Sequence, residues 1–130
     1  RFDNWDSYIP ARIGLPTAVD YALDTGLEAI QERVQYLAAL LRNRRSEFAG
    51  VVVRDLGQHR CGIVTFTKEN ESASALKQRL ASHQINISVS PARCARLDLD
   101  SRGISELARA SVHYFNTEAE IDRFCTKLSQ

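Results

Sequence analysis

The sequence predicts an α+β fold: a mostly antiparallel sheet of about four strands, with helices on one face and a long helix near the N-terminus. Two observations lead to this prediction. Segments with helical spacing of apolar residues are mixed with short segments that alternate or are rich in β-branched residues. Their order (helix, helix, strand, strand, helix, strand, strand, helix) also lacks the regular strand–helix alternation of a parallel sheet.

Two helices are expected early in the chain. Residues 1–10 show no clean period and are predicted to form an arm or linker, and a short helix is expected over residues 15–23. Thr25 and Glu28 then form a capping-box pattern. A long amphipathic helix ending near Phe48 should follow, because apolar residues recur three and four positions apart. These residues are Leu27, Ile30, Val34, Leu37 and Leu41.

The middle of the chain is predicted to be mostly strand. Residues 51–53 and 62–67 should pair as antiparallel strands, joined by a connection of hairpin length that contains glycine. Ser72 is suited to cap a helix that extends to about Ser82. Residues 85–89 then alternate in polarity and predict a third strand.

A long polar segment over residues 92–105 leads to the last strand. It is long for an irregular connection, and long loops in compact domains often have functional roles. Cys94 lies between Arg93 and Arg96, whose positive charges favour the nucleophilic thiolate. The residues alone leave open whether Cys94 is a nucleophile or an inert loop cysteine.

The last strand, expected over residues 108–114, runs directly into a helix that begins with a capping box at Thr117 and Glu120. Arg109 and His113 lie on the polar face of this strand, opposite a face of small and apolar residues. The planar guanidinium of Arg109 is suited to bind a carboxylate through two hydrogen bonds. A surface arginine on an edge strand is an equally good interpretation of the pattern. The helix has an apolar stripe formed by Ile121, Phe124, Cys125 and Leu128.

The composition excludes several classes of protein. Of 130 residues, 44% are hydrophobic and 25% are charged, and the net charge of +1 gives no reason to expect a nucleic acid or a membrane as partner. We find neither a signal peptide nor an apolar run of the roughly 20 residues that span a bilayer, so a soluble, cytoplasmic protein is expected. The three cysteines form no CxxC pair, which argues against a disulfide framework or a metal site. Because the sequence contains no methionine, we expect it to be a piece of a longer protein.

The C-terminal segment resembles a known family. Arg109-Ala110-Ser111 followed by Tyr114-Phe115-Asn116-Thr117-Glu118-Ala119-Glu120-Ile121-Asp122 is similar to the C-terminal signature of the class V aminotransferases. These pyridoxal-phosphate enzymes include cysteine desulfurases, selenocysteine lyases and isopenicillin N epimerase-like proteins. Gly26-Leu27-Glu28-Ala29-Ile30 and Gly62-Ile63-Val64-Thr65-Phe66 extend the resemblance over nearly the whole chain.

The resemblance implies that the cofactor and the substrate carboxylate are bound by different domains. Residues 15–130 would be the small C-terminal domain, and residues 1–14 an arm or linker from a large domain that precedes them. That large domain would bind pyridoxal 5′-phosphate, so the chain alone should be inactive, and the full-length enzyme is expected to be a homodimer. Arg109 would bind the carboxylate of an amino-acid substrate. Without the large domain, Trp5, Tyr8 and Ile9 should be exposed.

The branch of the family is a separate question. Cys94 stands 15 positions before Arg109, a spacing compatible with the loop nucleophile of one group of cysteine desulfurases. The preceding segment, Ser90-Pro91-Ala92-Arg93, lacks the glycine and histidine usual there, which favours the epimerase-like branch and makes desulfuration the alternative. A free-standing α+β module that binds a ligand or partner without catalysis is a further hypothesis. The reading frame upstream of Arg1 would distinguish it from a domain of an enzyme.

Overall fold

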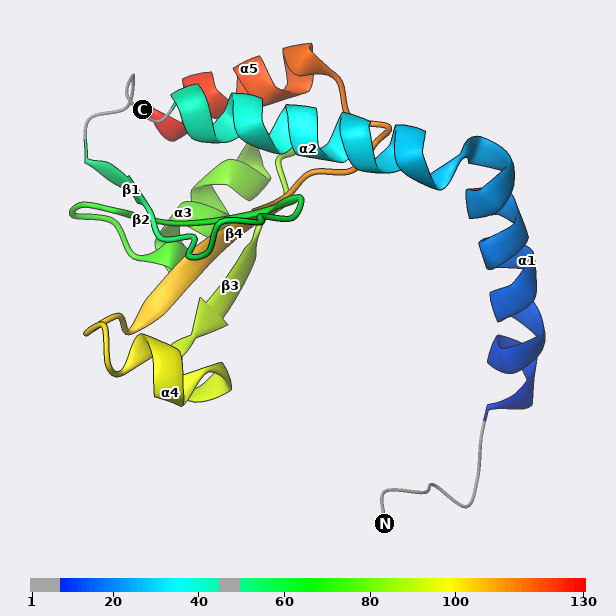
Figure 1. Ribbon diagram of the computed structural model, residues 1–130. Helices are drawn as coiled ribbons and strands as arrows, with labels where there is room; N and C mark the ends of the chain where they lie inside the picture. The colour runs from blue at the N-terminus through cyan, green and yellow to red at the C-terminus, as the bar shows by residue number, and fades with distance from the viewer. Residues whose placement is uncertain (1–7, 45–49) are drawn as a thin grey trace. The chain divides into compact units, whose positions relative to one another are not determined.

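The computed structural model describes residues 8–44 and 50–130 (Figure 1). The chain divides into two compact units between Glu32 and Arg33, and each is considered by itself. Within the described ranges, no helix is both long enough and apolar enough to cross a membrane.

The first unit is dominated by helix α1 (Ile9–Thr25), which starts earlier than the helix expected over residues 15–23. Pro10 lies in the first turn, where a missing N–H leaves no hydrogen bond unmade, so the helix can begin before it. The capping box expected at Thr25 is wrong. Thr25 is the last residue of α1, and its hydroxyl donates 2.9 Å to the carbonyl of Tyr21. Gly26, with φ of 94°, ends the helix.

The apolar side chains of α1 are exposed within the described unit, and none of its residues is buried. Tyr8 and Ile9 are 75% and 62% exposed, as expected, whereas Trp5 lies outside the described residues. The other large apolar side chains exposed along the helix are Ile13, Leu15, Val19, Tyr21 and Leu23.

The second unit contains the sheet and the remaining elements. Helix α2 (Leu27–Asn43) continues into it from the first unit, and its predicted end near Phe48 falls outside the described residues. The elements that follow are β1 (Val51–Val53), β2 (Ile63–Lys68), α3 (Ala73–Ser82), β3 (Ser88–Pro91), the 3₁₀ helix η2 (Ala92–Cys94), α4 (Arg96–Leu99), β4 (Glu106–Ser111) and α5 (Glu118–Leu128). The strand order is β1-β2-β4-β3, and every neighbouring pair is antiparallel, which confirms the predicted fold class.

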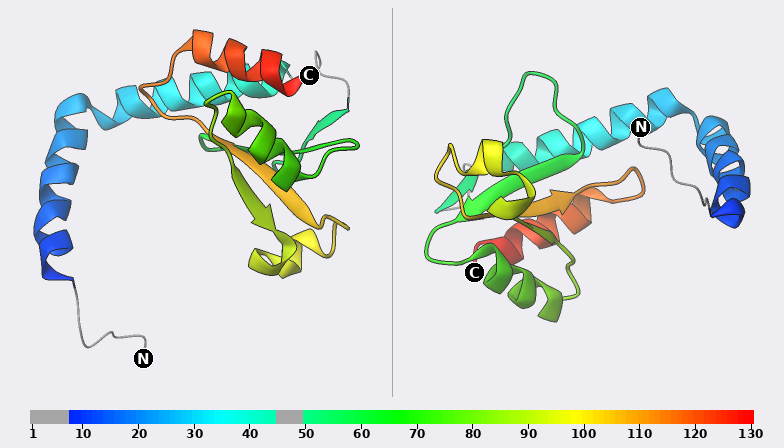
Figure 2. Two further views of the ribbon diagram at one scale, coloured as in Figure 1. Left: turned by 180° about the vertical axis from the view of Figure 1, so that it is seen from behind. Right: turned by 90° about the horizontal axis from the view of Figure 1, so that it is seen from below.

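The main core lies between one face of the sheet and helices α2, α3 and α5 (Figure 2). Alternate residues of β2 and β4, Val64 and Phe66 with Ala108 and Ala110, point into it because successive side chains of a strand point to opposite faces. The helices contribute Leu37, Ala38, Leu41, Leu76, Leu80, Ile121, Phe124, Cys125 and Leu128. The predicted stripe of α5 is therefore confirmed, as is its capping box at Thr117 and Glu120.

β3 and β4 depart most from their predicted boundaries, whereas β2 is shifted by one residue. β3 begins at Ser88 instead of residue 85, because the N–H of Ile85 donates 3.0 Å to the carbonyl of Leu80 at the end of α3. β4 ends at Ser111, before the predicted end at residue 114. There the N–H of His113 donates 2.8 Å to the side chain of Asn116, and the chain turns.

The polar segment over residues 92–105 is not irregular, in contrast to the prediction. It contains η2 and α4, and Leu99 of α4 packs with Ile104 and Leu107 in a second small apolar cluster. Leu107 points away from the main core because it alternates with Ala108. Helix α4 is therefore associated with the opposite face of the sheet from α2, α3 and α5.

Candidate functional site

Arg109 lies in the interior of the sheet. β4 is paired on both sides, and Arg109 is opposite Thr65 of β2 and Ser88 of β3. The interpretation of Arg109 as an arginine on an edge strand is therefore wrong. Its side chain points away from the main core, because its neighbours Ala108 and Ala110, 1% and 7% exposed, point into it.

Thr65 is the closest cross-strand neighbour of Arg109. Both main-chain groups of Thr65 bond toward β1: its N–H donates 2.7 Å to the Asp55 carboxylate, and its carbonyl accepts from Arg54 at 2.7 Å. Thr65 and Arg109 thus form a non-hydrogen-bonded pair, the kind whose side chains approach more closely. The Thr65 hydroxyl and the guanidinium therefore share one small area of the open face.

The guanidinium of Arg109 differs from the other half-buried guanidinium groups of the chain. Five half-buried arginines form an ion pair: Arg33 with Glu118, Arg42 with Asp55, Arg44 with Asp122, Arg79 with Glu71 and Arg102 with Asp98. Arg54 donates to the Thr67 hydroxyl. The side chain of Arg109 is half-buried yet has neither a hydrogen bond nor an ion pair with any residue that the structure describes. A guanidinium whose donors are not taken up by the described residues can donate two parallel hydrogen bonds to an external anion, so this position is suited to one.

The carboxylate of Asp55, which bonds the cross-strand partner of Arg109, is already satisfied. Asp55 accepts from the N–H and hydroxyl of Thr65 and, at 2.7 Å, from Nε of Arg42. Burial raises the pKa of the Asp55 carboxyl, but the hydrogen bonds from Thr65 and Arg42 outweigh it, and the pKa is lowered overall. Asp55 therefore remains ionised and bound to Arg42, and does not neutralise Arg109.

Cys94, the candidate nucleophile, is an exposed free cysteine at the end of η2. It follows β3 by three residues, and the β3 residue opposite Arg109 is Ser88, at the far end of that strand. Ser88 and Pro91 are three residues apart on β3, which corresponds to about 10 Å along the strand at 3.3 Å per residue. The structure thus places Cys94 beyond the end of the strand next to Arg109, without direct contact between them.

His113 does not belong to this site. It was expected on the polar face with Arg109, but β4 ends before it, and its ring stacks on Phe115 with centroids 4.3 Å apart. Within the described ranges, no group of three metal-ligating side chains is found either.

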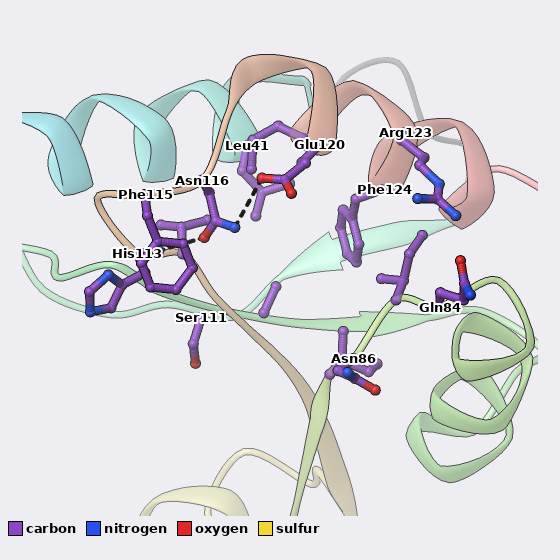
Figure 3. Close-up of a pocket in the computed structure, with 15 residues that line it drawn as sticks. Leu41, Gln84, Asn86, Ser111, His113, Phe115, Asn116, Glu120, Arg123 and Phe124 are labelled. Atoms are coloured by element: carbon purple, nitrogen blue, oxygen red, sulfur yellow. Dashed lines mark hydrogen bonds between the residues drawn. The ribbon is translucent and has the colours of Figure 1, made fainter.

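A second feature could not be found from the sequence. A cleft of about 560 Å³ lies on the side of the sheet covered by α5, lined by parts of residues 84–87, 110–116 and 120–124 (Figure 3). These segments are far apart in the chain, and no local pattern links them. Arg109 is not among the lining residues.

The geometry defines an α+β domain whose sheet is covered by α2, α3 and α5 on one face. On the other face it presents an arginine that has no partner among the described residues. The chain belongs to the aminotransferase class-V family, whose model matches residues 7–124.

Relatives of the chain include cysteine desulfurases. It is 30% identical over 128 residues to a probable cysteine desulfurase from Xylella fastidiosa, matching 98% of this chain and 30% of the relative. It is 29% identical over 130 residues to one from Halalkalibacterium halodurans, covering 100% of this chain and 32% of the relative. The chain thus spans about a third of the length of these relatives.

Solved structures show the same fold. A cysteine desulfurase from Thermococcus onnurineus superposes with a TM-score of 0.88 at 23% identity, covering 99% of this chain and 32% of that one. The cystine C-S lyase C-DES, in complex with its product cysteine persulfide, gives 0.77 at 20% identity over 100% of this chain and 32% of that one. The curated relatives favour the cysteine desulfurase alternative over the epimerase-like branch that the segment before Cys94 favours.

The lysines of the chain do not fit the role of a covalent anchor for pyridoxal phosphate beside Arg109. Lys68 alternates with Thr67, so it points to the helix-covered face, where Nζ contacts Glu71 at 3.2 Å and the carbonyl of Leu128 at 2.8 Å. Lys77 is exposed on α3, and Lys127 on α5 contacts Gln130. None of these amines lies on the open face of the sheet.

Proposed function

We propose that this chain is the C-terminal domain of a pyridoxal-phosphate enzyme of the cysteine desulfurase group, and that Arg109 binds the α-carboxylate of its amino-acid substrate. The observation that supports this proposal is the half-buried guanidinium of Arg109, which has no partner among the described residues. Two parallel hydrogen bonds to a carboxylate would satisfy it and fix the orientation of the substrate.

The cofactor belongs to the part of the enzyme that this chain lacks. Pyridoxal phosphate, when bound, supplies the electron sink for chemistry at the amino acid. A large domain before Arg1 would hold it, and the complete enzyme would be a homodimer. The role of this chain is to position the substrate: Arg109 binds its carboxylate, and the hydroxyls of Thr65 and Ser88 surround that position.

Cys94 is the candidate nucleophile for desulfuration of cysteine. Three observations support it: its exposure, its position beyond the strand next to Arg109, and the cysteine desulfurases among the relatives. Because Cys94 does not contact Arg109, the η2 and α4 segment would have to approach the bound substrate in the complete enzyme. The thiolate would then form an S–S bond with the substrate sulfur while the carbon–sulfur bond of the substrate breaks. The electron pair of that bond would stay with the substrate carbon, for which the cofactor would supply the electron sink, and Cys94 would be left as a persulfide.

The carboxylate role of Arg109 can be tested in a protein that joins this chain to the cofactor domain. Replacing Arg109 by Gln should raise KM for the amino acid roughly 10- to 100-fold, because each hydrogen bond between charged groups contributes about 1.5–3 kcal/mol. Lys77→Gln, which removes an exposed charge on α3 away from Arg109 and Cys94, is the control and should leave KM unchanged. Equal KM values for the Arg109 variant and the unmodified enzyme would contradict the role.

The role of Cys94 has its own test. In the same protein, assayed with an added thiol that reduces the persulfide, Cys94→Ala should abolish release of sulfide from L-cysteine. Cys61→Ala, which removes the other exposed cysteine, should retain it. If Cys94→Ala retains sulfide release, the thiol is not the nucleophile. An enzyme that instead transaminates or epimerises its substrate would favour the broader class V assignment.

The chain alone should neither become yellow with added pyridoxal phosphate nor turn over amino acids, because its lysines are not placed to hold the cofactor beside Arg109. Absorption spectroscopy and an amino-acid assay of the purified chain test this. A coloured, active preparation would refute the binding of the cofactor by a separate domain. The same preparation, inactive but able to bind small carboxylates at Arg109, would leave the free-standing binding module as the competing hypothesis.

A further inference from the structure

The cleft on the helix-covered side of the sheet combines an apolar floor with a charged rim. Ile87 and Phe124, both 7% exposed, lie in the floor. Gln84, Glu120 and Arg123 lie along the rim (Figure 3). Its volume of about 560 Å³ is within the range of roughly 300–1,000 Å³ usual for small-molecule sites.

Glu120 and Arg123 are opposite charges one helical turn apart on α5, yet no ion pair joins them in the described structure. Each is held by another contact. Glu120 accepts from the N–H of Thr117 at 2.9 Å and from Asn116 at 3.1 Å, both through Oε2. Arg123 donates 2.7 Å through Nη2 to the carbonyl of His83. The remaining oxygen of Glu120 and the rest of the guanidinium have no partner among the described residues.

The hydrogen bonds to Glu120 favour the ionised form of its carboxyl. The hydrogen bond from the N–H of Thr117, followed by that from Asn116, lowers the pKa of the Glu120 carboxyl below its ordinary value. The charge of Arg123 also contributes to this lowering. The rim therefore presents the Glu120 carboxylate and the Arg123 guanidinium above an apolar floor.

Gln84 adds a polar group next to the cation. Its φ of 59° is in the left-handed region, which side chains other than glycine, asparagine and aspartate seldom adopt. Gln84 follows His83 at the end of α3, and the carbonyl of His83 accepts the hydrogen bond from Arg123. Figure 3 shows Gln84 and Arg123 toward one end of the cleft and Glu120 with Asn116 toward the other, with Phe124 between them.

We propose that this cleft binds the zwitterion of an α-amino acid with an apolar side chain. Arg123 and Gln84 receive the carboxylate, Glu120 receives the ammonium group, and the side chain packs on Ile87 and Phe124. A zwitterion is the small ligand that matches two opposite charges held apart over an apolar surface.

This site is distinct from the one at Arg109. Ala110 lines the cleft, and Arg109 points to the opposite face of the same strand. An amino acid in the cleft would therefore act as an effector and not as the substrate bound at Arg109. The inference does not depend on the proposed function of Arg109.

The ligand itself provides the first test, with the unmodified 130-residue chain. Titration with L-leucine, followed by ¹H–¹⁵N NMR, should shift resonances of residues 84–87 and 120–124. L-Leucinamide, which lacks the carboxylate, and 4-methylpentanoate, which lacks the amine, should produce much smaller shifts. Three results would overturn the proposal: no response to leucine, valine or phenylalanine; an equal response to 4-methylpentanoate; or shifts centred on Thr65, Ser88 and Arg109.

Variants provide the second test. Glu120→Gln removes the charge but retains the capping box, since glutamine also serves at that position. It should weaken leucine binding roughly tenfold or more, and Arg123→Gln should do the same, because each removes a charged hydrogen bond. Lys127→Gln removes a charge from the same helix away from the cleft and should leave binding unchanged. If Glu120→Gln, with a spectrum as well dispersed as that of the unmodified chain, binds leucine equally well, the site is not the one proposed.

Discussion

Helices α1 and α5 differ both in helix propensity and in contacts. The interior of α1 contains Gly14 and Pro16, whereas α5 contains neither glycine nor proline. In the described structure, α1 has no side-chain N-cap and no buried residue. α5 begins with a capping box and buries Ile121, Phe124, Cys125 and Leu128. Its last carbonyls are also held, because Lys68 and Arg79 donate to Leu128 and Lys127 at 2.8 and 2.6 Å. A helix in a protein gains most of its stability from tertiary contacts. Within the described chain α5 makes such contacts, whereas α1 buries no residue.

The largest expected effect compares one apolar side chain from each helix. Phe124→Ala should lower the free energy of unfolding by about 3–5 kcal/mol, because it leaves a cavity against Phe66, whose ring centroid is 6.1 Å away. Leu23→Ala in α1 removes a side chain that is 56% exposed. It should change the free energy of unfolding by no more than about 0.5 kcal/mol. Urea denaturation of the two variants measures both. Equal losses would mean that α1 is packed as firmly as α5.

The next effect concerns the C-terminal end of α5, which depends on Glu71. Hydrogen bonding to Arg79, followed by contact with Lys68, lowers the pKa of Glu71 from 4.5 to about 2. Folding lowers the pKa of this carboxyl, so its contribution to stability is complete when the pH is above the pKa of the group in the unfolded chain. The contribution is lost as the pH falls from about 4.5 to about 2. Glu71→Gln should cost about 1–2 kcal/mol at neutral pH, a value reduced by solvent screening.

The pH dependence distinguishes this pair from general acid unfolding. Over the same window, the stability of Glu71→Gln should depend less on pH than that of the unmodified chain. Glu69→Gln, an exposed neighbour without an ion pair in the described structure, should retain the full dependence. A Glu71 variant with an unchanged pH profile would show that the ion pair contributes nothing.

The smallest effect is at the N-terminal end of α5. Thr117→Ala removes the hydroxyl that accepts from the N–H of Glu120 at 3.2 Å and should cost about 1 kcal/mol. Thr117→Ser should retain most of that stability. Tyr8→Ala at the start of α1 should cost nothing measurable, because Tyr8 makes no side-chain cap. Thermal unfolding of the three variants tests whether the N-terminal residue of α5 contributes more to stability than that of α1, as is expected for the buried side chains of α5.

The parts of the fold that could be predicted from sequence are those determined by local contacts. The capping box of α5 and the Ser72 cap of α3 involve residues three apart, and both are present. The ends of β3 and β4 could not be predicted, because they depend on bonds made by Ile85 and His113 to residues outside each strand.

The same distinction applies to the candidate site. The alternation of residues around Arg109 predicted that its side chain leaves the core, and the structure agrees. Its central position, its pairing with Thr65 and Ser88, and the engagement of Asp55 by Arg42 depend on strand order and register. The amino-acid cleft was missed entirely, because its rim comes from the end of α3 and from α5, which meet only in the folded chain.

Because β4 is paired on both edges, an insertion or deletion in this strand affects both faces of the sheet. Arg109 and Ala110 are adjacent in the chain but serve opposite faces of the sheet. Inserting or deleting one residue in β4 would exchange these faces, placing a guanidinium among Ile121 and Phe124 at a cost of several kcal/mol. A substitution of Arg109 itself is compatible with the fold, whereas a change in the length of this strand is not.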